Sequence, residues 1–194
     1  MNPKEFISAV RASYLKARIA RSGSRSRITI TRCTSHCVSS EIEDLFALYC
    51  SKKLPNSNKY RILLDPQITF PGSNLRNESG KRALLIRPDI CILKEGVAAI
   101  FFDMKMDLGY KRDSFLNDMR KTNTLVRRVL GKNALASDGK TKEKIHFKIA
   151  KDLKHHVVVV SSKNFESRPK KVVIPVLDNM HILSGGIHPN AYCN

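Results

Sequence analysis

The chain of 194 residues is long enough to bury one substantial hydrophobic core and too short for two well-formed domains. It has 35 lysines and arginines against 17 acidic residues, and the resulting net charge of +18 favours a polyanionic partner such as nucleic acid. No apolar run approaches the ~18 residues of a membrane-spanning helix, no signal-peptide core opens the chain, and five irregularly spaced cysteines fit a reducing compartment, so we expect a cytoplasmic protein without a membrane partner.

Two amphipathic helices are predicted in the first part of the chain. The first spans residues 3–21 and ends at Gly23, and residues 1–38 form a basic arm that either faces DNA or a second subunit, or covers a sheet edge. The second begins at Ser39 and Ser40, and Glu41, Glu43 and Asp44 lie near its start. Acids at this position complement the helix dipole and need no further role.

The next stretch predicts the first strand of a sheet and a polar loop. The strand runs over residues 60–64 and 67–70, with an interruption at Asp65-Pro66. The loop over residues 71–82 is rich in turn formers. Its polar side chains could read DNA bases, or it could be an ordinary surface loop.

The stretch 83–107 reads as two hydrophobic strands that each carry charges on one face. The period of two places Asp89 on one face of the first strand, and it places Asp103 and Lys105 on one face of the second. The opposite face of the first strand is purely apolar: Leu84, Ile86, Pro88, Ile90 and Ile92.

The loop between these strands sets the distance between the two acids. We expect a three-residue loop, Lys94-Glu95-Gly96, with Gly96 in the left-handed conformation and Leu93 opposite Val97. Asp89 then lies across from Phe101 and diagonal to Asp103, roughly 7 to 8 Å away on the same face. A two-residue loop would shift the pairing by one residue and send the acids to opposite faces.

Two half-buried carboxylates at this spacing, with an ammonium beside them, predict a site for a divalent cation. Like charges raise one another's pKa, and a metal relieves their repulsion. Carboxylate oxygens suit Mg²⁺, with Mn²⁺ as a substitute, better than zinc. Lys105 would position a water or stabilise developing charge, so the arrangement suits phosphodiester hydrolysis.

Pro88-Asp89, followed by Asp103-Met104-Lys105 on the next strand, resembles the PD-(D/E)xK nuclease superfamily. The resemblance covers about residues 39–162. It implies a restriction-endonuclease-like core, a mixed central sheet flanked by helices in the order αβββαβ, within one domain over residues 1–194. It also implies that the preceding helix supplies a third metal ligand; Glu43 fits the family's pattern best, although the helical wheel does not separate it from Glu41.

The activity that the resemblance implies is magnesium-dependent cleavage of double-stranded DNA. Asp89, Asp103 and Glu43 would hold the metal, and Lys105 would orient or deprotonate the attacking water. A homodimeric type II restriction enzyme is the first choice, because cutting both strands of a palindrome needs two sites related by a two-fold axis. A structure-specific resolvase or repair nuclease is the alternative.

In a non-catalytic interpretation, Pro-Asp is a turn and Asp-x-Lys is a solvated pair on an edge strand. The chain would then be a basic nucleic-acid-binding protein without catalysis. Against this interpretation, the long apolar flanks favour buried central strands, in which unpartnered charge is costly.

Beyond the hairpin, residues 114–130 predict a helix whose basic outer surface suits phosphates. We expect residues 132–156, dense in lysine, to form a mobile loop and a short helix, and residues 157–160 to form a buried parallel strand. Residues 172–177 predict an edge strand within a C-terminal extension over residues 163–194.

Overall fold

The computed structural model describes residues 1–22, 39–55, 58–76, 83–107, 112–138, 141–161 and 179–183. The strand predicted at 172–177 lies outside them. The described elements comprise three helices and eight strands. The helices are α1 (Pro3–Ser22), α2 (Ser39–Lys53) and α3 (Arg112–Val129). The strands are β1 (Tyr60–Leu64), β2 (Ile68–Thr69), β3 (Leu85–Ile86), β4 (Ile90–Lys94), β5 (Val97–Asp107), β6 (Asn133–Ser137), β7 (Lys144–Ser161) and β8 (Met180–Ile182).

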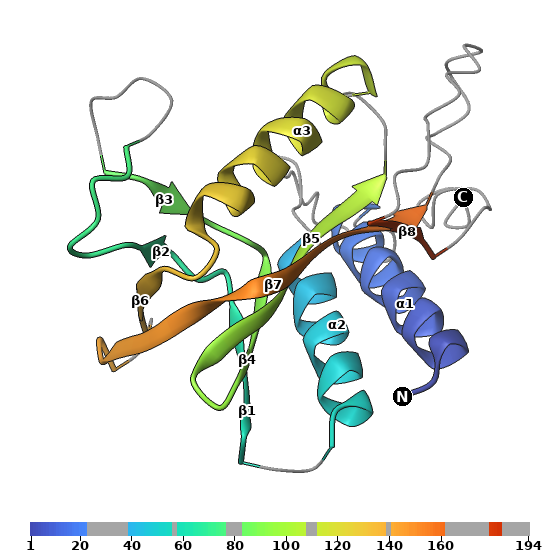
Figure 1. Ribbon diagram of the computed structural model, residues 1–194. Helices are drawn as coiled ribbons and strands as arrows, with labels where there is room; N and C mark the ends of the chain where they lie inside the picture. Colours follow the sequence, from blue (N-terminus) through green and yellow to red (C-terminus); the bar gives the residue numbers. More distant parts are fainter. Residues whose placement is uncertain are drawn as a thin grey trace.

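The strands form one mixed sheet in the order β1-β4-β5-β7-β6-β2-β3, and β8 pairs with β7 (Figure 1). Strand β4 pairs antiparallel with β1 and β5, whereas β7 runs parallel to β5 and β8. The expected mixed sheet flanked by helices is therefore confirmed.

Hydrophobic clusters on the two faces of the sheet explain why the helices pack where they do. Helices α1 and α2 cover one face, where Phe6 and Phe46 pack edge to face with ring centroids 5.8 Å apart. On the other face, Phe101 of β5 belongs to the same buried cluster as Val126 and Val129 of α3. Strands β4 and β5 are thus central strands with apolar neighbours on both sides.

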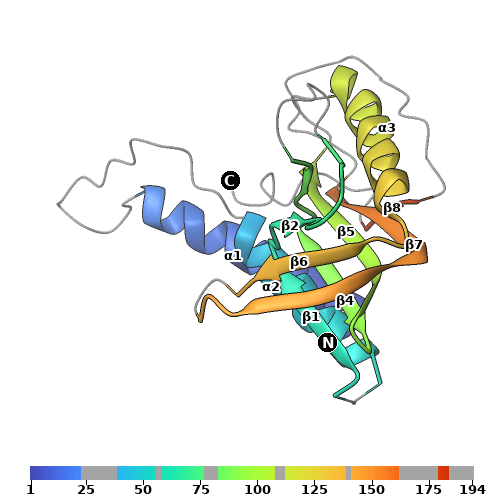
Figure 2. The same cartoon turned by 60° about the vertical axis from the view of Figure 1, so that its left-hand side comes forward.

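The sheet is strongly curled, because β7 bends midway along its length. Ala98 of β5 pairs with Ile149, but Ile100, two residues on, pairs with Lys154. The first half of β7, paired with β6, consequently crosses over the β1-β4-β5 part of the sheet (Figure 2). This curl encloses the larger hydrophobic cluster.

Three of the predictions for the strands are wrong. Residues 83–93 do not form one strand, because β3 pairs with β2 whereas β4 pairs with β1 and β5. Leu84 and Ile86 consequently pack in a different hydrophobic cluster from Ile90 and Ile92.

Residues 60–64 and 67–70 do not form one interrupted strand: β1 pairs with β4, while β2 pairs with β3 and β6. Residues 132–156 contain β6 and most of β7 instead of a loop and a short helix. The alternation of buried Ile145, Phe147 and Ile149 with exposed residues is the period of a strand, and it outweighs the lysine content.

The helices at residues 3–21, 39 onward and 114–130 are confirmed to within two residues at each predicted end. The buried parallel strand at residues 157–160 is confirmed as the second half of β7. None of the helices in the described ranges combines the length and the apolar character that crossing a bilayer requires.

Candidate acidic site at the ends of the central strands

The β4–β5 turn differs from the predicted one. Lys94 pairs with Val97, so the loop has two residues, Glu95 and Gly96, with φ angles of 51° and 75°. Positive φ at both positions is typical of the type I′ turn, whose twist matches that of the flanking strands. Gly96 is left-handed as expected, but the three-residue loop and the pairing of Leu93 with Val97 are wrong.

A β-bulge compensates for the shorter loop. Leu93 pairs with Ala98, whereas Ile92 pairs with Ile100, so Ala99 of β5 has no partner on β4. The extra residue shifts the pairing by one and reverses the effect of the two-residue loop on side-chain direction. Asp89 and Asp103 therefore remain on one face of the sheet.

The strand pairing brings Asp89 and Asp103 closer together than expected. Phe101 pairs with Cys91, not with Asp89, and Phe102 pairs with Ile90. Continuing this register by one residue places Asp89 opposite Asp103. Oδ2 of Asp89 accepts a hydrogen bond of 2.5 Å from the backbone N–H of Met104. The acid at the start of β4 is thus bound to the strand that carries Asp103.

Asp103 is largely buried and has a histidine partner. Its Oδ2 lies 3.1 Å from Nε2 of His155, and the side chains of Asp103 and His155 are 18% and 5% exposed. His155 comes from β7, where it pairs with Phe101. The sequence does not reveal this histidine as a partner of Asp103, because the contact depends on the register between two strands far apart in the chain.

Glu43 is the buried acid near the start of α2, whereas Glu41 in the first turn is only partly buried. The pKa of Glu43 is raised from 4.5 to about 7. Burial is the largest cause, and the negative charges of Asp89, Asp65 and Asp44 contribute the rest. Lys105 opposes this effect. Glu43 is therefore electrostatically coupled to the acids at the ends of the strands.

Burial also raises the pKa of Asp89. The Met104 N–H and the charge of Lys105 oppose this shift, whereas Asp103 and Asp65 add to it. The structure thus brings Glu43, Asp89, Asp103 and Lys105 into one electrostatic neighbourhood. Lys105 is half-buried and forms no salt bridge with any residue in the described ranges.

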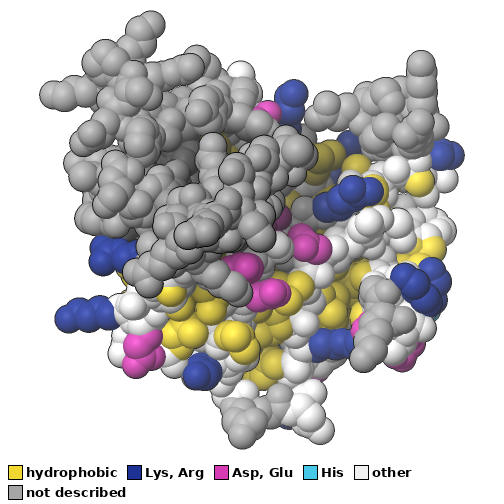
Figure 3. Space-filling view, turned by 180° about the vertical axis from the view of Figure 1, so that it is seen from behind, with side chains coloured by type: hydrophobic (Ala, Val, Ile, Leu, Met, Phe, Trp, Pro, Cys, Tyr) yellow, Lys and Arg dark blue, Asp and Glu magenta, His cyan; other side chains and the backbone are white. Residues whose placement is uncertain are grey.

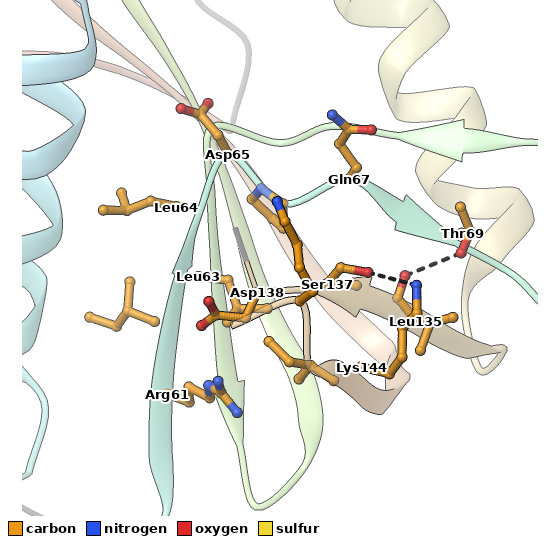
Figure 4. Close-up of a pocket in the computed structure, with 15 residues that line it drawn as sticks. Arg61, Leu63, Leu64, Asp65, Gln67, Thr69, Leu135, Ser137, Asp138 and Lys144 are labelled. Carbon is orange, nitrogen blue, oxygen red and sulfur yellow. Dashed lines mark hydrogen bonds between the residues drawn. The ribbon is translucent and has the colours of Figure 1, made fainter. Parts of the chain in front are cut away.

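Asp65 joins this neighbourhood, although the sequence indicates it only as part of a strand interruption. Its backbone N–H donates a 2.8 Å hydrogen bond to the carbonyl of Asp89, and its φ of 45° is uncommon for a residue other than glycine. Figure 4 shows Asp65 where β1 ends. An acid in a strained turn directly after a strand, before a proline, is the sequence signal that could have identified it.

A pocket of about 650 Å³ lies beside Asp65, between β1 and the β6–β7 part of the sheet (Figure 4). Its charged lining includes Arg61, Lys142 and Lys144 in addition to Asp65 and Asp138. Seen from behind, acidic side chains gather near the middle of the surface, beside a hydrophobic area (Figure 3). Exposed Leu48 and Leu64 are among the large hydrophobic residues of the described surface.

The donor set suits a hard divalent cation. Glu43, Asp89 and Asp103 offer carboxylate oxygens, which are the ligands of magnesium, and their mutual repulsion would fall on binding a cation. As the side chains stand, no three acids, histidines or cysteines in the described ranges are grouped closely enough to hold a metal ion. Asp89 and Asp103 use Oδ2 in their hydrogen bonds, which leaves Oδ1 of each as the candidate ligand atom.

Comparison with protein-family models, with curated proteins and with solved structures finds no match to this chain.

Proposed function

We propose that the protein is a magnesium-dependent DNA endonuclease. The observation that carries the proposal is the electrostatic coupling of Glu43, Asp89 and Lys105, with Asp103 acting on Asp89, at the ends of the two central strands. Acids with raised pKa values beside a lysine are expected of a functional site, because a merely structural position gains nothing from that repulsion.

The order of elements supports the same proposal. Helix α2, strands β1, β4 and β5, helix α3 and strand β7 follow one another as αβββαβ, the order implied by the resemblance to PD-(D/E)xK nucleases. Strands β2, β3 and β6 are additions to that order. The candidate acids belong to α2, to the start of β4 and to β5, as in that superfamily.

In the proposed reaction, Glu43, Asp89 and Asp103 would hold the cation. Bound Mg²⁺ would polarise a phosphoryl oxygen and lower the pKa of a water molecule. Lys105, two residues after Asp103 on the same face of β5, would orient the attacking water and steady the developing negative charge as an ammonium, or accept the proton of that water as a neutral amine. The net charge of +18 attracts the DNA.

Within this class, a homodimeric type II restriction enzyme is the form we propose first, because two sites related by a two-fold axis are needed to cut both strands of a palindrome. A resolvase or repair nuclease is the second form. Discrete bands from a plain plasmid support the first form, and cleavage restricted to branched or mismatched DNA supports the second.

A basic nucleic-acid-binding protein without catalysis is a distinct candidate. The contact between Asp103 and His155 favours it, because a buried acid paired with a histidine also serves stability alone. Salt-sensitive binding does not separate the two candidates, because phosphate contacts produce it in both.

The test is digestion of supercoiled plasmid with Mg²⁺, with Ca²⁺ and with chelator in parallel. We expect cleavage with Mg²⁺ alone, and its loss in Asp103→Ala and Lys105→Ala with DNA binding retained. Asp152→Ala and Lys148→Ala replace exposed residues of the same types on β7 and are the matched controls. Equal cleavage by Asp103→Ala and Asp152→Ala would refute the assignment.

A further inference from the structure

His155 is the buried side chain that joins the acidic site to the other layers of the fold. Its Nε2 lies 3.1 Å from Oδ2 of Asp103, and its Nδ1 lies 2.9 Å from Oδ1 of Asn123 on α3. Both ring nitrogens are therefore occupied. Because the side chain is 5% exposed, water does not compete strongly for these contacts.

Two asparagines fix the imidazole in place. Nδ2 of Asn179, just before β8, lies 3.4 Å from Oδ1 of Asn123 and donates a 3.1 Å hydrogen bond to the carbonyl of His155. The Asn123 oxygen thus accepts, and Nδ1 of His155 donates to it. The proton between Nε2 and Asp103 then forms one hydrogen bond, whichever of the two groups carries it.

This arrangement gives the two carboxylate oxygens of Asp103 different roles. The imidazole is fixed by contacts from α3 and from the residue before β8, and it binds Oδ2 of Asp103. The carboxylate therefore cannot rotate freely, and Oδ1 is the oxygen that remains for a ligand. Partners of this kind, which orient a metal-binding carboxylate, commonly change metal affinity by about 10 to 100-fold when they are removed.

We propose that His155 is a positioning residue that holds Asp103 with Oδ1 directed to a divalent cation. The proposal rests on the proposed nuclease function. His155 contacts neither DNA nor the cation; it acts through Asp103. A purely structural histidine would stabilise the sheet equally well but would not affect how tightly the protein binds Mg²⁺.

A neighbouring cavity makes the two roles separable. His155 lines a pocket of about 450 Å³ together with Asn123, Asn179 and Arg127. Removing the imidazole in His155→Ala therefore leaves a space that adjoins this pocket and that free imidazole can enter. A positioning role is restored by imidazole in solution, since the added ring can again bond Oδ2 of Asp103.

The first experiment measures Mg²⁺ binding by calorimetry without DNA. We expect His155→Ala to weaken binding by about tenfold or more and added imidazole to restore part of the loss. His155→Gln keeps an N–H donor and should lose less. His146→Ala, an exposed histidine of the same strand, is the matched control and should bind as wild type does with or without imidazole.

The second experiment measures plasmid cleavage against Mg²⁺ concentration. We expect His155→Ala to need about tenfold more Mg²⁺ for half-maximal rate, with a smaller change in rate at saturation, and imidazole to reverse the shift. Unchanged Mg²⁺ binding in folded His155→Ala overturns the positioning role while wild-type cleavage leaves the nuclease function intact. A wild-type protein whose Mg²⁺ binding is weakened by His155→Ala but which cuts no DNA overturns the nuclease function alone.

A third measurement covers the case in which His155→Ala does not fold. Ring-nitrogen NMR signals of wild-type His155 should move when Ca²⁺ is added, because the cation draws on the same carboxylate, whereas those of exposed His146 should stay in place. A His155 signal that does not respond while Ca²⁺ binds overturns the proposal without any variant.

Discussion

Asp89 accepts a hydrogen bond from the backbone N–H of Met104, the residue between Asp103 and Lys105. The acid at the start of β4 therefore has two tasks: it holds β5 in place, and it contributes negative charge to the proposed cation site. The two tasks respond differently to substitution, because a hydrogen-bond acceptor can be kept while the charge is removed.

Asp89→Asn should lose cleavage but keep the fold. The amide oxygen still accepts from Met104, so we expect a change below about 1 kcal/mol in the free energy of unfolding, and a fall of about a thousandfold in cleavage. Asp89→Ala leaves the Met104 N–H without its partner and should cost about 1–3 kcal/mol as well. Urea unfolding and plasmid cleavage separate the effects. Equal unfolding curves for the two variants would contradict this account.

Glu43 should make the folded protein less stable as pH rises. Its pKa is about 7 in the folded protein against 4.5 in a free side chain, so between these values the folded state binds more protons than the unfolded state. The free energy of unfolding should therefore fall from pH 4.5 to 7, and the raised pKa of Asp89 acts in the same direction.

Glu43→Gln tests this linkage, because an amide does not titrate. We expect the variant to gain stability over wild type above pH 7 and to show a shallower decline between pH 4.5 and 7. Urea midpoints at intervals of pH give the result, and Glu41→Gln on the same turn is the control. A decline as steep in Glu43→Gln as in wild type would show that other groups cause it.

Deleting Ala99 should leave the site intact. This residue is the unpaired one in the β4–β5 register, and without it Leu93 still pairs with Ala98 and Ile92 with Ile100, in a ladder that has no bulge. Asp103 and Lys105 therefore keep the face that they share with Asp89, and we expect the deletion variant to fold and to retain cleavage. Ala99→Ser keeps the bulge and should change stability by less than about 1 kcal/mol. Urea unfolding and plasmid cleavage measure both variants, and a deletion variant that folds without cutting DNA would contradict this account.

The exposed cations of α3 should contribute to DNA binding without sequence preference. Arg120 and Lys121 are exposed on this helix, and each phosphate contact removed should reduce the slope of log K against log salt by about 0.9. We therefore expect Arg120→Ala/Lys121→Ala to lower the slope by up to about 2. Lys94→Ala/Lys148→Ala, at the opposite end of β5, should leave it unchanged. Fluorescence anisotropy at several salt concentrations measures both.

Much of the fold was predictable because its signals are local. The alternation in residues 97–107 predicted β5, and the apolar stripe after Ser39 predicted α2. Asp89 and Asp103 share a face as predicted, but residues 83–93 form two strands, β3 and β4, instead of one. The details of the hairpin were wrong, because nothing distinguishes Ala99 from Ala98 in the sequence. The expected common face holds only because two departures, a shorter loop and a bulge, cancel.

The partners of the site could not be read from the sequence, because they depend on distant pairing. His155 reaches Asp103 only through the parallel register of β5 and β7, and Asp65 reaches Asp89 only because β1 lies next to β4. The strand β7 itself was predictable from the alternation of Ile145, Phe147 and Ile149, but its lysine content favoured a loop.

The parallel pairing of β5 and β7 also governs how the protein folds. Asp103 pairs with Val157, and every residue between them has to be synthesised before the pair can form. Such non-local contacts are formed late and slowly, since the entropy of closing a long loop is lost before the contact is gained. During translation, the edge of β5 in the β4–β5 hairpin therefore stays unpaired until β7 has been synthesised. Strand β7 protects that edge from pairing with other chains only after residue 161 has left the ribosome.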